Sequence, residues 1–263
     1  MTWILGGTPP FGYAALISDV RVSWGTDSYA DVLQKIHHVG PWMMAGFAGS
    51  VQLGFAAIED MRRFLRTDSP NIAWRSEEAA WRWRRRARRA FAKAPLNVQE
   101  LGCSILLVGV SPTGGGGPFG PLAKCVRMRS PEFFPERPSF PFAWLSIGSG
   151  STHDLARSFA EQTLSSAFPY LQGEVMNPGG TAVHVAMMVG MELMNTPLVG
   201  VSPQLQVGTV RMLKAETRTL LGRRDGLLER SWTTTGSTGL CKNWWEFRQF
   251  AQGVGRQATA AAT

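Results

Sequence analysis

Hydrophobic residues form short runs near the N-terminus and then two stretches with helical periodicity. Residues 3–8 and 13–24 are apolar and β-branched runs on either side of a proline- and glycine-containing segment at 9–12. This pattern predicts two strands joined by a turn. A further apolar run at 42–49 predicts another strand.

Two amphipathic helices are predicted next. After Ser50, apolar residues recur at spacings of three or four; these are Leu53, Ala56, Ala57, Met61 and Phe64. A second helix is expected from Ser76 to about Ala94, with Ser76 as N-cap and two glutamates in its first turn. Its apolar side is expected to contain Ala80, Trp83, Ala87, Ala90, Phe91 and Ala94.

The remaining chain repeats this order of strands followed by helices. Strands are predicted at 103–110, 123–130, 142–148 and 207–217, and helices at 148–162 and 181–195. Paired helices that alternate with runs of strands indicate an α+β fold, in which two antiparallel sheets are enclosed between helical layers. We expect one domain over residues 1–215, an extension of unknown role over 216–263, and a frayed tail from residue 253.

Composition places the chain among globular proteins. It has 263 residues, of which 44% are hydrophobic and only 17% charged, so a full core can form and bulk disorder is not expected. The uncharged stretches, such as CSILLVGV and TAVHVAMMVG, are too short or too mixed in composition to cross a bilayer, and the N-terminus lacks a signal-type segment. We therefore expect a cytoplasmic protein.

Cysteines and histidines give no sign of a metal or a disulfide framework. Cys103, Cys125 and Cys241 are widely spaced, no CxxC pair exists, and the four histidines have no ligand spacing. Buried thiols are the expected state. No metal or cofactor is expected.

The net charge of +8 is unevenly distributed. Residues 81–93 (WRWRRRARRAFAK) hold seven of the 27 basic residues. Such a cluster attracts nucleic acid, anionic lipid or acidic polypeptide. The simpler interpretation is the solvated face of a helix that packs by its other side.

Familiar catalytic motifs are absent from the sequence. Gly115 to Gly120 form a GxGxxG pattern, but a proline interrupts it and a strand-like segment follows, so it predicts a hairpin loop and not a nucleotide site. The sequence contains no GxSxG elbow, HExxH or P-loop lysine motif.

A dispersed set of segments carries the remaining chemical signal. Its members are Thr2; Asp19, Arg21, Ser23 and Gly25 in DVRVSWG; Lys35; Ala45, Gly46, Ala48 and Gly49 in AGFAGS; and Ile147, Gly148, Ser149 and Gly150 in IGSG. Taken singly, each has an ordinary explanation as a turn or a surface charge. Their order and spacing, with Lys35 sixteen residues after Asp19, are more specific.

Together these segments resemble the proteasome β-type family of N-terminal nucleophile hydrolases, including the HslV-like bacterial peptidases. That family has a leading threonine, a D-S-R-A-T-x-G segment, a lysine sixteen residues after that aspartate, an A-G-x-A-G-G turn, and I-G-S-G before a helix. The resemblance covers residues 2–66 and 143–212. It implies a four-layer αββα sandwich.

The resemblance also implies a role for each matched residue. Thr2 would be the nucleophile, and its own α-amine the base. Lys35 would lower the pKa of that amine, with Asp19 holding Lys35 in place. Ser149 would relay protons, and the backbone N–H of Gly49 would stabilise the oxyanion. The residues that map onto substrate contacts are Arg21, Ser23, Met44, Phe47 and Ala48.

Some positions depart from the family pattern. The third acidic residue of the family aligns with Met191, and Glu192 beside it should point elsewhere on a helix. A hydroxyl residue expected near Met194 is displaced to Thr196. The hairpin between Thr2 and Asp19 is one residue longer than usual. These departures predict reduced or narrowed activity.

The leading expectation is a self-compartmentalising threonine peptidase that forms stacked homo-oligomeric rings and hydrolyses polypeptides after removal of Met1. Any ATPase partner is left open, and neither membrane nor nucleic acid is the expected partner. One alternative is a catalytically silent ring protein that acts as a scaffold or binding module. The other is a protein that binds nucleic acid or an acidic partner through residues 81–93, where Arg82, Arg84 and Arg86 would carry the binding.

Overall fold

The chain forms a mixed α+β structure with several antiparallel sheets, as the sequence pattern predicts. The computed structural model describes residues 2–8, 13–24, 28–72, 75–111, 122–138, 144–148, 200–211, 214–225, 229–235 and 239–261. The helices predicted at 148–162 and 181–195 lie outside the described residues. No helix in the described part of the chain has the length and apolar character needed to span a bilayer.

The largest sheet has six strands in the order β12-β11-β10-β2-β1-β9. All of its neighbouring strands pair antiparallel. Its strands are β1 (Ile4–Gly7), β2 (Tyr13–Asp19), β9 (Trp144–Ile147), β10 (Leu205–Arg211), β11 (Lys214–Asp225) and β12 (Glu229–Thr235).

A second sheet has four strands in the order β5-β6-β7-β8, also antiparallel. Its strands are β5 (Ile36–Gly40), β6 (Met43–Gly49), β7 (Cys103–Ser111) and β8 (Leu122–Arg129). A two-stranded ribbon of β3 (Arg21–Trp24) and β4 (Ser28–Asp31) continues from the end of β2.

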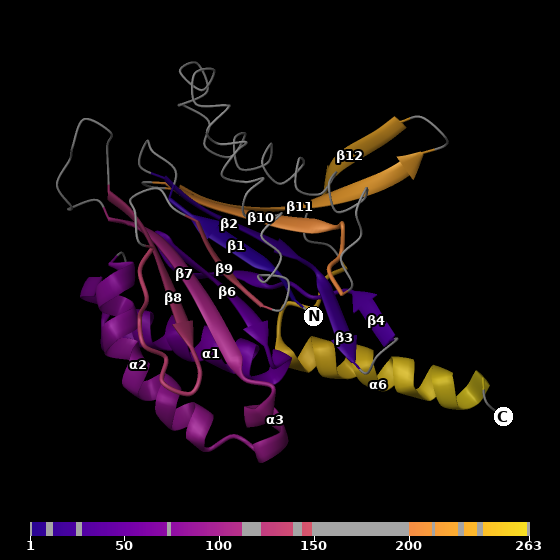
Figure 1. Cartoon of the computed structure of the whole chain (residues 1–263), viewed down its shortest axis with the longest axis horizontal. Coiled ribbons are helices and arrows are strands. Elements are labelled where there is room, and N and C mark those ends of the chain that lie inside the picture. Colours follow the sequence, from indigo (N-terminus) through magenta and orange to yellow (C-terminus); the bar gives the residue numbers. More distant parts are fainter. Residues whose placement is uncertain are drawn as a thin grey trace.

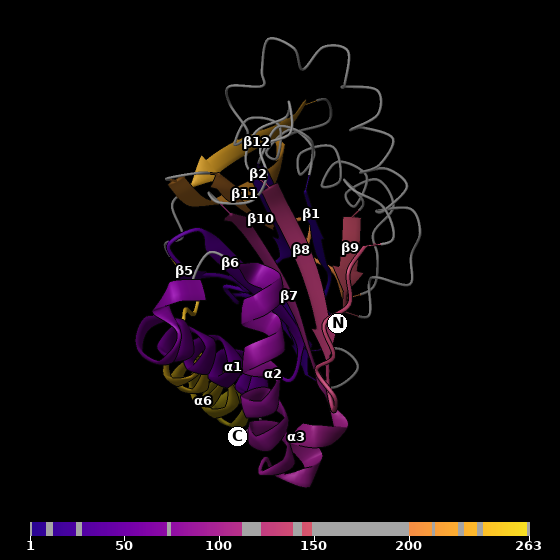
Figure 2. The same ribbon diagram turned by 90° about the vertical axis from the view of Figure 1, so that its left-hand side faces the viewer.

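Helices cover one face of the four-stranded sheet, and the six-stranded sheet packs on its other face (Figure 1; Figure 2). α1 and α2 contact the sheet directly, and α6 packs on α1. The helices are α1 (Val51–Arg63), α2 (Ser76–Ala92), α3 (Leu96–Glu100) and α6 (Trp244–Ala261). α1 continues into a π-helical turn (Phe64–Asp68), and a short 3-10 turn (Pro70–Ile72) follows it.

The core between the two sheets is built from fully buried aliphatic side chains. Ile4 and Leu16 on one sheet meet Met44, Leu106 and Val108 on the other. Burying each such side chain stabilises the fold by about 1.5–3 kcal/mol. These contacts hold the N-terminal strand β1 against the four-stranded sheet.

The helical stripes differ in part from the predicted ones. In α1 the buried residues are Gly54, Phe55, Ile58 and Met61, whereas Ala56 is exposed. The buried stripe of α1 is therefore rotated relative to the predicted one. Burying the larger Phe55 and Ile58 removes more apolar area from water than burying the alanines. In α2 the predicted Ala80, Trp83 and Ala87 are buried, but Ala90 is exposed.

The N-cap of α2 and the continuity of one strand were also predicted wrongly. Ser76 is not the N-cap of α2, since Arg75 holds that position and Ser76 is the first helical residue. The single strand predicted at 207–217 is two strands, β10 and β11, in which Arg211 lies opposite Lys214. The predicted boundary after residue 215 therefore lies inside β11.

The C-terminal segment packs against the rest of the chain. Cys241 forms a parallel bridge with Leu33; its N–H donates to the Val32 carbonyl at 2.6 Å, and its own carbonyl accepts from the N–H of Gln34 at 3.1 Å. Phe247 belongs to the same hydrophobic cluster as α1 and α2. The tail predicted to fray from residue 253 is helical as far as Ala261. The extension thus holds the segment that leads to Lys35.

His37 is a buried histidine in the core beneath the helices. Its ring stacks on Phe47 and meets Phe55 edge-on, and its Nε2 lies 2.9 Å from the carbonyl of Gln34. Burial, assisted by the charge of Arg62, lowers the pKa of His37 to about 3. The folded protein therefore keeps this ring neutral under conditions in which the unfolded chain protonates it.

This pKa predicts an acid-sensitive fold. A lowered folded-state pKa means that the unfolded state binds more protons between about pH 6.5 and pH 3, so stability falls as the pH falls through that window. Between pH 7 and pH 5 the loss should be about 2 kcal/mol, and it should disappear in His37→Gln. Urea unfolding at both pH values measures it, and the smaller contribution of His38, whose pKa burial also lowers, should remain in His37→Gln. A pH dependence that is identical in wild type and His37→Gln would contradict the assignment.

Candidate active site

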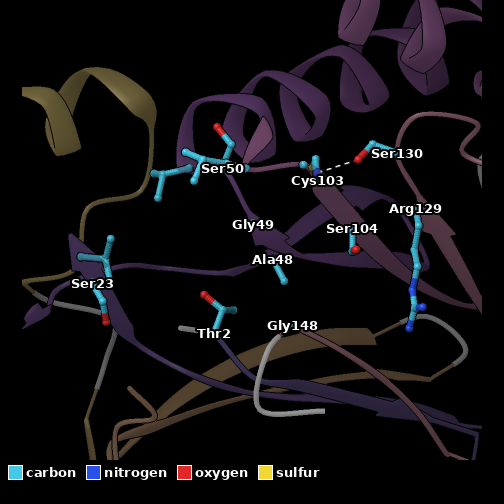
Figure 3. Close-up of a pocket in the computed structure, with 14 residues that line it drawn as sticks. Thr2, Ser23, Ala48, Gly49, Ser50, Cys103, Ser104, Arg129, Ser130 and Gly148 are labelled. Atoms are coloured by element: carbon cyan, nitrogen blue, oxygen red, sulfur yellow. Dashed lines mark hydrogen bonds between the residues drawn. The ribbon is translucent and has the colours of Figure 1, made fainter. Parts of the chain in front are cut away.

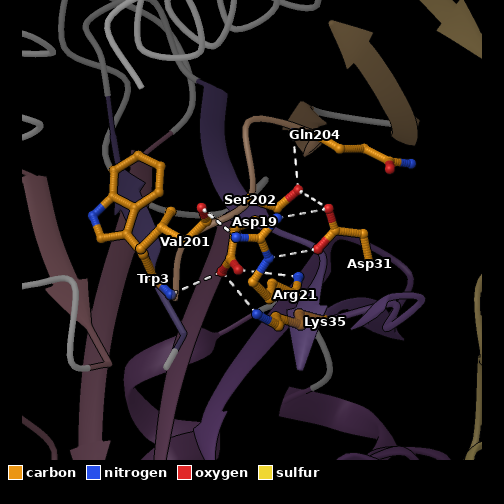
Figure 4. A network of polar contacts seen from close by, with 8 residues as sticks. All are labelled: Trp3, Asp19, Arg21, Asp31, Lys35, Val201, Ser202 and Gln204. Atoms are coloured by element: carbon orange, nitrogen blue, oxygen red, sulfur yellow. Dashed lines mark hydrogen bonds and ion pairs between the residues drawn. The ribbon is translucent and has the colours of Figure 1, made fainter. Parts of the chain in front are cut away.

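A buried ion pair lies where β2 ends and β5 begins. Asp19 is the last residue of β2, and Lys35 directly precedes β5. The Nζ of Lys35 lies 2.7 Å from Oδ1 of Asp19, and both side chains are fully buried (Figure 4). A buried pair of this kind requires further hydrogen bonds to offset its desolvation.

Backbone groups supply those bonds and tie the pair to the N-terminus. The N–H of Trp3 donates to Oδ1 of Asp19 at 2.8 Å, and the N–H of Arg21 donates to Oδ2 at 3.0 Å. The N–H of Asp19 in turn donates to the Trp3 carbonyl at 3.2 Å. The Lys35 nitrogen and the amide that follows Thr2 therefore contact the same carboxylate oxygen.

The charge state of Lys35 is set by two opposing effects. Complete burial lowers the pKa of its amine, while the contact with Asp19 acts in the opposite direction and favours the ammonium. A second link holds the lysine backbone, since its N–H donates to Oε1 of Gln206 at 2.8 Å. The lysine is thus fixed at both its backbone and its side chain.

Thr2 itself borders a pocket of about 610 Å³, a volume in the usual range for ligand sites. Figure 3 shows the side chain of Thr2 beside Gly148, with Gly49 and Ala48 across the pocket. The lining residues are Thr2, Val22, Ser23, Ala48, Gly49, Ser50, Val51, Leu101, Gly102, Cys103, Ser104, Arg129, Ser130 and Gly148.

Two glycines at the pocket have positive φ and stand against backbone atoms. Gly49 (φ 96°) ends β6, and a Cβ there would lie 2.5 Å from the Gly102 carbonyl oxygen. Ser50 follows it and caps α1 through its hydroxyl, which accepts from the N–H of Leu53 at 3.4 Å. Gly148 (φ 92°) follows β9, and its Cβ would lie 2.0 Å from the carbonyl oxygen of Thr2. Only glycine fits at either position.

Gly148→Ala should therefore displace the Thr2 peptide. Gly239 is a matched control, because it has the same kind of backbone (φ 96°) and a methyl group added there would meet nothing within 4 Å. Gly239→Ala should cost about 1–2 kcal/mol in unfolding free energy through backbone strain alone. Gly148→Ala should cost about 1–3 kcal/mol more through overpacking. Equal losses in the two variants, measured by urea unfolding, would mean that Thr2 is not held against Gly148.

The structure brings together six of the ten residues to which the resemblance assigns a site role. Thr2, Ser23, Ala48 and Gly49 line one pocket, and the Asp19–Lys35 pair lies behind the peptide that follows Thr2. The predicted sites that lie outside the described residues are Gly25, Ser149, Gly150, Met191, Glu192, Met194 and Thr196.

Arg21 does not line the pocket. Its guanidinium forms a two-bond contact with Asp31, at 2.8 and 3.1 Å, and lies 4.0 Å from the centre of the Tyr29 ring. The hydrogen bonds that Arg21 donates to Asp31 raise the pKa of the guanidinium. Ser202 adds a hydrogen bond to the same carboxylate at 2.8 Å. Arg21 therefore holds the ribbon β3–β4 that carries Ser23.

Met44 and Phe47 do not line the pocket either. Met44 is buried between the two sheets, and Phe47 is buried on the opposite face of β6, against His37 and Phe55. Both faces of β6 are covered, so alternate side chains enter two different cores. Only Ala48 and Gly49, at the end of the strand, reach the pocket.

Among the described residues of the pocket, the other hydroxyl and thiol groups have no activating base beside them. Burial raises the pKa of the Cys103 thiol to about 12, so almost no thiolate exists at neutral pH. The hydroxyl of Ser130 accepts a hydrogen bond from the Cys103 N–H at 2.9 Å. None of the described lining residues is a histidine, carboxylate or lysine that could serve as a base. A threonine with its own amine needs no such neighbour.

The basic helix α2 is largely neutralised by carboxylates of the same chain. Arg86 pairs with Asp60 and Asp68, Arg82 with Glu78, and Arg84 and Arg88 with Glu132. Trp83 is buried and donates its indole N–H to Asp60 at 2.8 Å. These contacts favour the interpretation of α2 as a packed helix with a solvated face.

Among the pocket residues that were not predicted from the sequence are three polar ones, Ser104, Arg129 and Ser130. They reach the pocket because β7 pairs with β6, and β8 pairs with β7, in a fixed register. No local motif marks them, and cross-strand neighbours of this kind are visible only once the register is known.

No protein-family model matches the sequence, and no curated protein matches it at a significant level. In the described part of the chain, no three metal-ligating side chains are grouped closely enough to hold an ion.

Proposed function

We propose that the chain is a threonine peptidase of the N-terminal nucleophile type, similar to the proteasome β-type and HslV-like proteins. The observation that carries this proposal is the buried Asp19–Lys35 pair, whose shared oxygen also binds the amide that follows Thr2. Burying the lysine ammonium beside the Thr2 backbone costs desolvation free energy, which a purely structural role does not explain. Its position suits a reaction at Thr2.

The first chemical step would be attack by the Thr2 hydroxyl on the carbonyl carbon of a peptide bond. The α-amine of Thr2 accepts the hydroxyl proton, directly or through water. An unperturbed α-amine has a pKa of about 7.7–8.0, and the nearby Lys35 ammonium disfavours protonation and lowers that pKa. This reaction requires a free amine, so Met1 must be removed.

The tetrahedral intermediate then needs hydrogen-bond donors for its oxyanion. The turn at Gly49 lies across the pocket from Thr2 (Figure 3), and its N–H would serve as one donor, an interaction worth about 3–4 kcal/mol. Collapse of the intermediate breaks the peptide C–N bond, and the protonated amine supplies the proton to the leaving nitrogen. Water, activated by the same amine, then hydrolyses the threonyl ester and restores the enzyme.

The wider proposal concerns the fold and its assembly. The helices over one sheet and the facing second sheet are consistent with three layers of an αββα sandwich. The fourth layer is expected from residues 148–162 and 181–195. We propose that copies of the chain form stacked rings that enclose the pocket, with polypeptides as substrates. A catalytically silent ring protein is the rival function.

Hydrolysis of internally quenched peptides by the purified protein tests this proposal, with Thr2→Ala as the matched blank. Cleavage that depends on Thr2 supports the peptidase. Cleavage that persists in the Thr2→Ala preparation comes from another source, and absence of cleavage across a diverse peptide set leaves the scaffold as the better account.

A further inference from the structure

Arg129 stands out among the residues around Thr2 because of its charge. It is the one charged residue among the described residues that line the pocket. No ion pair within the described part of the chain involves it, although its neighbour Arg127 pairs with Glu136. Its side chain is exposed at the pocket, so a substrate group can reach it.

The register of the four-stranded sheet explains why Arg129 lies in this pocket. Ala48 on β6 is opposite Ser104 on β7, which is opposite Arg129 on β8. Directly opposed residues of antiparallel strands point to the same face of a sheet. All three therefore face the six-stranded sheet, on the side where Thr2 lies.

The cross-strand row of Ala48, Ser104 and Arg129 also sets the distance between Arg129 and the proposed site of cleavage. Adjacent strands lie about 4.8 Å apart, so the backbone of Arg129 is roughly 10 Å from that of Ala48. An extended peptide advances about 3.3 Å per residue, so this distance corresponds to about three residues. In the view of Figure 3, Ser23 and Arg129 lie toward opposite ends of the pocket, and Thr2 lies between them.

We infer that Arg129 selects substrates with an acidic side chain within about three residues of the cleaved bond, on the side away from Ser23. A guanidinium binds a carboxylate through two parallel hydrogen bonds. Among the described lining residues, Ser104 and Ser130 contribute neutral polar groups beside the arginine, and none is a competing carboxylate. This inference rests on the proposed peptidase function.

The test uses internally quenched peptides that differ only by Glu, Gln or Lys, scanned over three residues on each side of the cleaved bond. Wild type should show a kcat/KM for the best Glu peptide about 10- to 100-fold above its Gln counterpart. Arg129→Gln should remove this ratio, and R129E should favour the Lys peptide. Arg85→Gln, an exposed arginine on α2, controls for net charge and should keep the preference.

Binding separates this inference from the proposed function. On Thr2→Ala protein, a fluorescein-labelled Glu peptide should bind at least about 10-fold more tightly than its Gln counterpart, and the additional Arg129→Gln change should abolish the difference. If binding discriminates but wild type cleaves nothing, Arg129 still recognises acidic peptides, and it is the peptidase proposal that fails. If wild type cleaves peptides without preference for Glu, or Arg129→Gln leaves the preference unchanged, the inference is overturned.

Discussion

Thr2→Ala is expected to reduce peptide hydrolysis by more than about 1000-fold. Alanine keeps the amine and the backbone but removes the hydroxyl oxygen that would form the ester. Thr2 is only partly buried, so the free energy of unfolding should change by no more than about 0.5 kcal/mol. The measurements are kcat/KM on a quenched peptide and urea unfolding of the same preparation.

Two variants make this result specific. Thr2→Ser retains both the amine and a hydroxyl, and it should keep measurable activity. Thr67→Ala removes a hydroxyl from an exposed position at the end of the first helical segment, and it should behave like wild type. Activity that survives in Thr2→Ala, with a preparation shown to be free of other peptidases, would exclude Thr2 as the nucleophile.

Lys35→Met should abolish activity and also weaken the fold. The change removes the proposed electrostatic effect on the Thr2 amine and leaves the fully buried Asp19 carboxylate without its cation. Breaking one partner of a buried pair typically costs about 3–5 kcal/mol. Urea unfolding measures the loss of stability, and the quenched peptide measures the loss of activity.

A double variant separates the two effects. Asp19→Asn combined with Lys35→Met removes both charges while one side-chain oxygen still accepts the Trp3 N–H, so it should recover part of the lost stability. It should remain inactive, since no ammonium lies near Thr2. Full activity in a stable double variant would show that the buried pair is structural only.

The sequence was most informative where chemistry and spacing coincide. Asp19 and Lys35 are sixteen residues apart, and the structure places them 2.7 Å apart, as the resemblance implies. Gly49 lies at a strand-to-helix turn, which is one of the interpretations that the AGFAGS pattern offered, and its positive φ explains the glycine. A backbone conformation that only glycine adopts and a buried charge pair both restrict which residue types can occur at a position, so the sequence can indicate them.

Side-chain direction was harder to predict. Met44 and Phe47 precede Gly49 and were expected to line a substrate pocket, but β6 is covered on both faces. A continuous apolar run shows that a strand is buried without showing which core each side chain enters. The same difficulty applies to α1, where Phe55 and Ile58 were not distinguished from the alanines beside them.

Long-range pairing was not visible in the sequence at all. Arg129 reaches the pocket because β8 is two strands from β6, and Cys241 lies beside Leu33 through a bridge between distant segments. Such neighbours depend on register and tertiary packing, which no local pattern encodes. The C-terminal helix α6 was also missed, although Trp244, Phe247 and Phe250 recur at helical spacing and pack in the cluster around α1.

Mass spectrometry of protein treated with a peptide epoxyketone tests the central claim most directly. This reagent needs an amine and a hydroxyl on the same residue, so the account predicts loss of Met1 and one adduct per chain on the peptide that begins with Thr2. Thr2→Ala protein should carry no adduct. Quantitative retention of Met1, or an N-terminal threonine that stays unlabelled while a control N-terminal nucleophile peptidase reacts, would contradict the account.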